Sequence, residues 1–263
     1  SHDLTLWTFL SQLIDDDQSC QASVTRVITH RTQAGASVPS ANTAAYCKAR
    51  GRLPEGLISG LTRQSGRDLD AEAKPDWQWR GRPMKLVDGS TFSMPDTPEN
   101  QAEYPQPRSQ KPGIGFPIAR SVAILSGSTG ALLDLNVGAY RGKGTGEHGL
   151  LRPMMENFEP GDVALGDGYY ASFFLIADLL MRGVDAIFPM HGARDCDFRT
   201  GHRLGKKDHL VEWVKPQRPA WMDAETYESF PDRITVREVE IRVERPGFRS
   251  GSRVLVTTFL KPR

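Results

Sequence analysis

The chain has 263 residues, a formal net charge of +1, 38% hydrophobic and 25% charged residues, which is ordinary for a globular protein with a sizeable core. No apolar stretch reaches the roughly 18 residues that a membrane span needs, and the polar N-terminus does not resemble a signal peptide, so we expect no membrane partner. Three scattered cysteines, Cys20, Cys47 and Cys196, argue against a disulfide framework and favour a reducing, cytoplasmic location.

Residues 1–70 predict a small helical domain. Apolar residues follow one helical stripe in "LTLWTFLSQLI" and recur with helical spacing at Val24, Val27 and Ile28. Between residues 21 and 67 there are seven Lys or Arg residues and one acid, Glu55. This block is either a solvated surface or a phosphate-binding patch. In the second interpretation the DNA contacts include Lys48, Arg50 and Arg52.

Residues 71–192 follow a different pattern, which predicts an α/β core. "MKLVDGSTF" predicts a strand that Asp88 closes, and the stretch after it is too rich in proline for regular structure. Residues 118–141 predict a hairpin around a Gly-Ser-Thr-Gly turn, and residues 146–158 predict a helix. "DVALGDGYYASFFLIADLLMRGVDAIFPM" reads as strand, helix, strand. This order is typical of a ribonuclease H-like mixed sheet, in which the first and fourth strands are adjacent and parallel.

Residues 193–263 predict a β-rich insertion and C-terminal region. Apolar residues alternate in "DRITVREVEIRVERP", but their parity shifts between Val236 and Val239, which predicts a bulge. "SRVLVTTFL" predicts a final strand. Trp213 is either a core residue or a stacking platform for an unpaired base. Basic residues of this region are further candidates for phosphate contacts, namely Arg203, Lys206 and Lys207.

Two aspartates form the candidate catalytic pair. Asp88 closes the first predicted strand and Asp167 closes the fourth, and each is followed by glycine. Because adjacent parallel strands present their carboxyl ends at one edge of a sheet, we expect the two carboxylates to lie close together. Two close carboxylates repel unless a cation neutralises them, so the pair predicts Mg²⁺ or Mn²⁺ acting on a phosphodiester.

Other patterns are weaker. "RGKGTGEHG" fails the dinucleotide-binding pattern because Glu147 replaces its third glycine, so Glu147 and His148 predict only a helix start. The spacing of Cys196, His202 and His209, with no paired Cys-x-x-Cys, does not favour zinc. A phosphatase of the haloacid dehalogenase type would need an aspartate where Leu86 stands.

Several blocks resemble the DDE transposases of bacterial insertion elements, specifically the insertion-sequence-four family. "VDGSTFSMPDTPENQAEYPQP" is similar to the family's first-aspartate block, and "GDVALGDGYYASFFLIADL" to its second. "RDCDFRTGHRLGKKDHLVEWVKPQRPAWM" and "RVLVTTFLKPR" resemble the segments before its third block, and "NTAAYCKARGRLP" resembles its N-terminal region.

The resemblance implies metal-dependent nicking and strand transfer at transposon ends, with Asp88 and Asp167 as the first two catalytic acids. It also implies double-stranded DNA as partner, a homodimer on DNA, and association with the bacterial nucleoid when DNA is bound. The family's third acid, a glutamate in a Tyr-Arg-Glu-Lys signature, is absent, so we expect a truncated transposase or a fragment that is inactive alone. The alternative is a non-catalytic DNA-binding remnant.

Overall fold

The structure, a computed structural model, describes residues 2–111, 113–244 and 251–261. It divides into two compact units, Ser1–Leu61 and Thr62–Arg263. The division lies inside helix α4 (Glu55–Ala71), not at the predicted residue 70. The later part of α4 belongs to the larger unit because Arg63 forms an ion pair of 2.8 Å with the buried Asp134 of strand β3.

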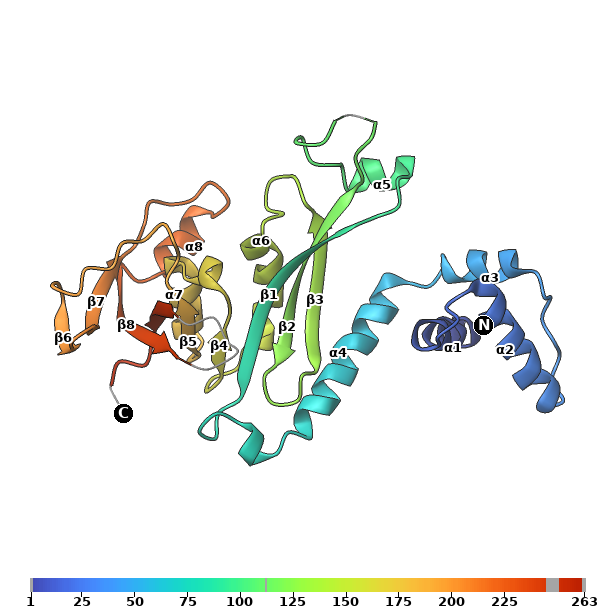
Figure 1. Cartoon of the computed structure of the whole chain (residues 1–263), viewed down its shortest axis with the longest axis horizontal. Coiled ribbons are helices and arrows are strands. Elements are labelled where there is room, and N and C mark those ends of the chain that lie inside the picture. Colours follow the sequence, from blue (N-terminus) through green and yellow to red (C-terminus); the bar gives the residue numbers. More distant parts are fainter. Residues whose placement is uncertain (1, 112, 245–250, 262–263) are drawn as a thin grey trace. The chain divides into compact units, whose positions relative to one another are not determined.

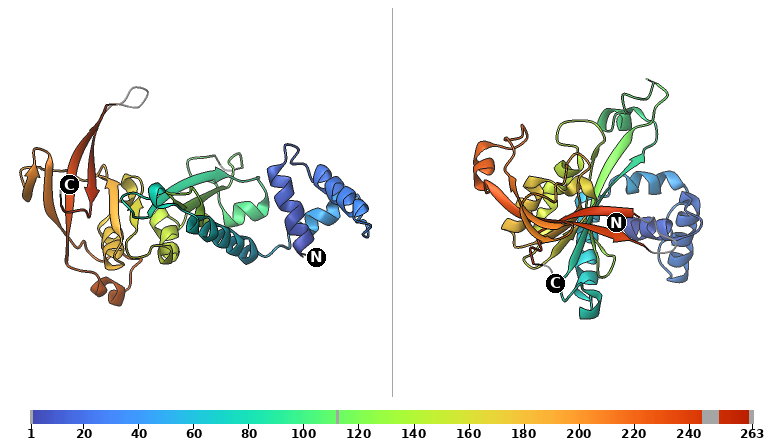
Figure 2. Two further views of the ribbon diagram at one scale, coloured as in Figure 1. Left: turned by 90° about the horizontal axis from the view of Figure 1, so that it is seen from below. Right: turned by 60° about the vertical axis from the view of Figure 1, so that its left-hand side comes forward.

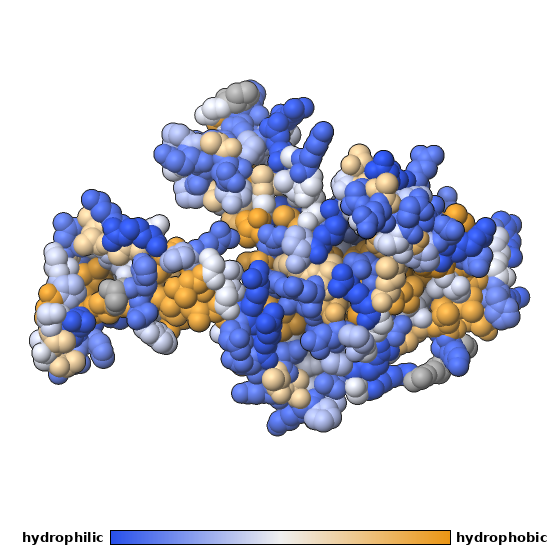
Figure 3. All heavy atoms as spheres, turned by 180° about the vertical axis from the view of Figure 1, so that it is seen from behind, coloured by the Kyte–Doolittle hydropathy of each residue, from blue (hydrophilic) through white to orange (hydrophobic). Residues whose placement is uncertain are grey.

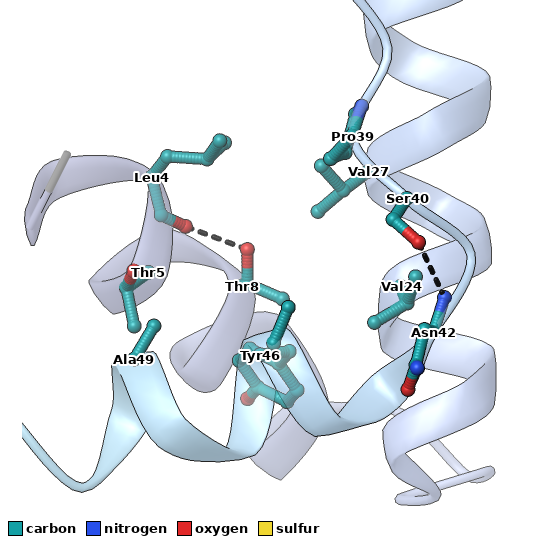
Figure 4. Close-up of a pocket in the computed structure, with 11 residues that line it drawn as sticks. Leu4, Thr5, Thr8, Val24, Val27, Pro39, Ser40, Asn42, Tyr46 and Ala49 are labelled. Atoms are coloured by element: carbon teal, nitrogen blue, oxygen red, sulfur yellow. Dashed lines mark hydrogen bonds between the residues drawn. The ribbon is translucent and has the colours of Figure 1, made fainter.

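The smaller unit is helical, as predicted. It contains α1 (His2–Ile14), α2 (Cys20–Gln33), α3 (Thr43–Arg50) and the beginning of α4. The Asn42 side chain accepts a hydrogen bond from the Ala44 amide, which caps α3. A mainly apolar cavity of about 170 Å³ lies among α1, α2 and α3, lined by side chains such as Val24, Val27 and Tyr46 (Figure 4). Hydrophobic surface remains visible on this unit (Figure 3).

The larger unit is built on one mixed sheet, which has nine strands among the described residues, in the order β3-β2-β1-β4-β5-β9-β8-β7-β6 (Figure 1). β1 pairs antiparallel with β2 and parallel with β4, so the first and fourth strands are adjacent and parallel, as predicted. The strands are β1 (Met84–Ser93), β2 (Ile118–Ser126), β3 (Leu132–Ala139), β4 (Val163–Leu165), β5 (Asp185–Pro189), β6 (His202–Gly205), β7 (Asp208–Val214), β8 (Arg233–Val243) and β9 (Gly251–Thr257).

Short helices cover the sheet and enclose one hydrophobic core. The predicted helix at 146–158 is α6 (Glu147–Leu151) followed by the 3-10 helix η2 (Arg152–Asn157), because Pro153 interrupts the α-helical hydrogen bonds. α6 packs on β2 and β3, η2 packs on β3, and α7 (Phe173–Met181) packs on β5. The core also includes side chains of β7, β8 and β9, so the β-rich region shares the core of the strands before it.

Two further local expectations were wrong. The proline-rich stretch contains a short helix, α5 (Pro98–Glu103), since Pro98 occupies the first turn, where a missing amide costs nothing, and Thr97 caps it. The predicted bulge in β8 is absent: β8 pairs with β7 and β9 in uninterrupted register. β8 and β9, the last two strands of the chain, lie side by side (Figure 2). The parity shift has another cause, because Glu238 is a buried acid on the same face as Val236.

The remaining helical segments lie outside this core sheet: η1 (Pro75–Trp77), η3 (Gly168–Tyr170) and α8 (Ala224–Ser229). Among the described residues, no helix combines the length and the apolar character needed to cross a membrane.

Candidate functional site

Asp88 of β1 and Asp167, two residues after the end of β4, lie at the same end of two neighbouring parallel strands. Three β1 residues, Met84 to Leu86, pair with the β4 residues 79 positions later, and 79 positions also separate the two aspartates. Asp88 does not close β1, which continues to Ser93, but it lies just beyond the last residue that pairs with β4.

Both aspartates are exposed and held by local backbone amides. Asp88 Oδ1 accepts a hydrogen bond of 2.9 Å from the Gly89 amide, and Asp167 Oδ1 accepts one of 2.8 Å from the Tyr169 amide. The second contact caps the 3-10 helix η3, which explains why the chain turns there. Neither aspartate takes part in an ion pair between described side chains, so both charges remain without a protein cation.

A third acid, Glu147, lies next to this pair. It is the first residue of α6, and its side chain covers the backbone of Gly89. A Cβ atom at residue 89 would lie 2.6 Å from Glu147 Oε2, so glycine is required for this close approach. The sequence predicted Glu147 only as a helix start, since nothing in the local spacing shows that the loop before α6 returns to β1.

Tyr170 is a buried neighbour of the three acids. Its side chain is completely buried, and its hydroxyl makes no hydrogen bond of standard geometry among the described residues. Burial raises the pKa of Tyr170 far above its ordinary value, and Glu147 raises this pKa further, both by its negative charge and by a hydrogen-bonding contact with the phenol; the charges of Asp167 and Asp88 add to the effect. The phenol is therefore neutral and carries a proton that it can donate toward the acids.

His148 follows Glu147 and is held in place by the strand-end turn. One ring nitrogen, Nε2, lies 3.0 Å from the Tyr169 carbonyl oxygen and donates to it. Burial lowers the pKa of His148, so the ring is neutral at pH 7. The ring contacts the tyrosines of η3, with centroids 4.9 Å from Tyr169 and 5.6 Å from Tyr170.

Most of the predicted phosphate contacts are on the surface. Lys48 and Arg52 are exposed in the smaller unit, but Arg50 is partly buried, where Nη1 donates to Gln12 Oε1 at 3.2 Å. In the larger unit, Arg203 and Lys206 are exposed at the β6–β7 turn. Lys207, beside them, forms an ion pair with Glu240.

Trp213 is a core residue, which is one of the two roles that the sequence left open. It is 5% exposed, and the Arg194 guanidinium lies 3.7 Å from the centre of its ring. Its Nε1 donates to Glu238 Oε1 at 3.0 Å. The ring therefore offers no open face to a base in this conformation.

The other carboxylate oxygen of Glu238, Oε2, belongs to a cluster of potential metal-binding side chains. Cys196, His209 and Glu238 are the one group of three such side chains, within the part of the chain that is described, whose donor atoms lie within 4.8 Å of one another. His209 Nδ1 donates to the Thr200 carbonyl at 2.7 Å, and Nε2 lies 2.9 Å from Glu238 Oε2. Burial, and then the contact with Glu238, raises the pKa of the Cys196 thiol to about 12.

These side chains satisfy one another by hydrogen bonds, and the predicted partner His202 lies exposed on β6, outside the cluster. The carboxylates of Asp88, Glu147 and Asp167 do not form such a tight group, so binding one ion would require their side chains to turn inward.

Comparison with known proteins links the chain to transposases. It is 28% identical over 140 residues to "Putative transposase InsZ" of Escherichia coli K12, covering 53% of this chain and 46% of that protein. It is 25% identical over 186 residues to "Transposase InsG for insertion sequence element IS4" of the same organism, covering 70% of this chain and 41% of the relative. The chain therefore spans less than half of the length of these curated relatives. These matches support a transposase.

Comparisons with protein families and with solved structures do not identify the chain further. No protein-family model matches the chain. An endonuclease V from Bacillus subtilis aligns with 74% of this chain and 73% of its own, at 14% identity and a TM-score of 0.30.

Proposed function

We propose that this chain carries the nuclease centre of a DDE-type DNA transposase related to the insertion-sequence-four family, on a ribonuclease H-like core. The main support is the parallel pairing of β1 and β4, because Asp88 and Asp167 follow the last paired residues and are two exposed carboxylates without an ion-pair partner among the described side chains. The similarity to two transposases supports the same conclusion from independent evidence.

The donor set fits a hard divalent cation. Carboxylate oxygens at an exposed strand end are typical ligands of Mg²⁺ and Mn²⁺, whereas the Cys196 cluster is buried and internally hydrogen-bonded. When bound, such ions activate the attacking water or 3′ hydroxyl and stabilise the leaving oxygen of the phosphodiester. Asp88 and Asp167 would hold the ions, and the backbone amides of Gly89 and Tyr169 would fix the orientation of these two carboxylates.

The partner in this proposal is double-stranded DNA, both transposon ends and target. Exposed basic residues would hold the phosphate backbone without reading sequence. Arg203, Lys206 and Lys207 would do so in the larger unit, and Lys48, Arg50 and Arg52 in the smaller one. We also propose a homodimer, since joining two ends requires two catalytic centres.

The test is Mn²⁺-dependent nicking of DNA that carries the element's ends, performed with the full-length protein of that element. Asp88→Asn and Asp167→Asn should each lower the nicking rate at least about 1000-fold, because they remove a metal ligand from the reacting centre. Both variants should still retard the same DNA in a gel shift assay. Asp178→Asn, which removes an acid of a surface ion pair on α7, is the control and should retain activity. Undiminished nicking by either site variant would contradict the proposal.

A further inference from the structure

We propose that Cys196, His209 and Glu238 form a binding site for a zinc ion, which fastens the loop between β5 and β6 to strands β7 and β8. The site is independent of the nuclease proposal, because none of its three residues belongs to β1 or β4.

Strand pairing brings two of the ligands together. His209 of β7 is directly opposite Glu238 of β8 in antiparallel register, so both side chains lie on one face of the sheet, and both are buried. His209 Nε2 lies 2.9 Å from Glu238 Oε2 and 3.8 Å from Cys196 Sγ. Tetrahedral zinc bonds of ordinary length require separations of about 3.3 Å and 3.6 Å between such atoms, so small side-chain movements would accommodate the ion.

The hydrogen bonds of His209 leave its Nε2 atom available as a ligand. Nδ1 lies 2.7 Å from the Thr200 carbonyl oxygen, which can only accept, so Nδ1 carries a hydrogen. In the neutral ring Nε2 then has a free lone pair, yet it faces a carboxylate oxygen of Glu238, which also only accepts. A proton or a cation must therefore lie between these two atoms. A proton serves only the two of them, whereas a zinc ion also uses the Cys196 sulfur, which converges on the same nitrogen.

Neighbouring groups hold two of the ligands in the orientation that coordination needs. The Thr200 carbonyl fixes the imidazole of His209, and the Phe198 ring packs against it, with ring centroids 4.9 Å apart. Trp213 Nε1 donates to Glu238 Oε1 at 3.0 Å, which leaves Oε2 for the ion. Metal ligands in proteins are usually oriented by such outer hydrogen bonds, to a backbone carbonyl for histidine and to a donor for a carboxylate.

The ligand types select zinc over magnesium. Thiolate and imidazole are ligands that zinc prefers, whereas Mg²⁺ prefers oxygen. The thiolate of Cys196 and the carboxylate of Glu238 would neutralise the ion, and binding releases the thiol proton. Cys196 is only partly buried, so a water can complete the tetrahedral set from its side. The sequence spacing did not favour zinc because the third ligand is Glu238 of the neighbouring strand, and not His202.

The experiment titrates Co²⁺, a spectroscopic substitute for zinc, into the purified chain carrying Cys20→Ser and Cys47→Ser. These two thiols lie 3.7 Å apart and could bind the ion themselves. A thiolate-to-cobalt charge-transfer band should appear. Equimolar Zn²⁺ should abolish this band, and a large excess of Mg²⁺ should leave it unchanged. Adding Cys196→Ser should remove the band. Absence of the band from the double variant, or its persistence after Cys196→Ser, overturns the inference.

A second measurement needs no change at the ligands, so it decides the question even if Cys196→Ser does not fold. Zinc X-ray absorption of the same double variant, loaded with Zn²⁺, should show one sulfur at about 2.3 Å together with imidazole scattering. A coordination shell of oxygen and nitrogen alone overturns the inference. Neither result bears on Asp88 and Asp167, because the nicking assay tests these two residues separately.

Discussion

The carboxylate of Glu147 occupies the space that a side chain at Gly89 would need. The Glu147 side chain fills the space between its own helix, α6, and the backbone of β1, so a larger residue at position 89 would have to displace it. Such a residue also provides a way to move Glu147 without removing its charge.

Gly89→Ala should therefore displace the Glu147 carboxylate. Its Cβ atom would meet the far end of a flexible side chain, so the fold should survive, with a loss of about 1–3 kcal/mol in the free energy of unfolding. The loss is measured by urea unfolding. Gly56→Ala, where nothing lies within 4 Å, is the control. Equal stability of Gly89→Ala and wild type would show that the Glu147 side chain does not pack on residue 89.

Glu238 should be essential for the β-rich region. Glu238→Ala leaves the Trp213 and His209 nitrogens buried without their acceptor, so we expect a loss of about 3–5 kcal/mol in urea unfolding. Glu240→Ala, two residues along the same strand, removes only the partly exposed partner of Lys207 and should cost less than about 1 kcal/mol. Equal effects of the two substitutions would contradict this assignment.

The ion pair between Lys85 and Asp162 should also be important for stability. Its atoms lie 2.6 Å apart, and both side chains are less than 10% exposed. Lys85→Met would leave the Asp162 charge buried and unpaired, at a cost of about 3–5 kcal/mol. Arg233→Met, which breaks the surface pair with Glu212, should cost below about 1 kcal/mol in the same urea titration.

His148 should make stability depend on pH. Burial lowers its pKa in the folded chain below the ordinary histidine value of about 6.5, so the unfolded chain binds a proton first as the pH falls. The contribution of His148 to stability is therefore complete above about pH 6.5 and is lost as the pH falls below that value. His148→Gln should show a shallower loss between pH 7 and pH 5.5 in urea titrations followed by tryptophan fluorescence. An unchanged slope would contradict the assignment.

The sequence predicted the parts of this fold that depend on short-range patterns. The helical unit, the hairpin, the strand-helix-strand unit and the parallel pairing of the first and fourth strands all follow from apolar spacing and turn residues. The location of Asp88 and Asp167 just after the paired residues of β1 and β4 also follows, because strand register is a simple count along the chain once the two strands are paired.

Contacts made by loops and buried acids could not be predicted in this way. Glu147 reaches Gly89 only because the glycine-rich loop folds back toward β1, and the spacing of apolar residues in the sequence does not predict the path of that loop. The burial of Glu238 could not be predicted because the residue is an acid. An acid on the core face of β8 interrupts the alternation of apolar residues, and a β-bulge would produce the same interruption in the sequence. The shift in the apolar pattern did mark an unusual residue, since Glu238 is a buried acid that is hydrogen-bonded to Trp213 and His209.

The position of β9 has a mechanical consequence. Its backbone is hydrogen-bonded to β5 on one edge and to β8 on the other, so the strands beside Asp167 and those near Arg203 belong to one continuous ladder. Force applied at the β6–β7 end must travel through these hydrogen bonds as a bending or twisting of the sheet, since no flexible joint between described strands interrupts them. A ligand pulling on that distant rim would strain the strand end that carries Asp167.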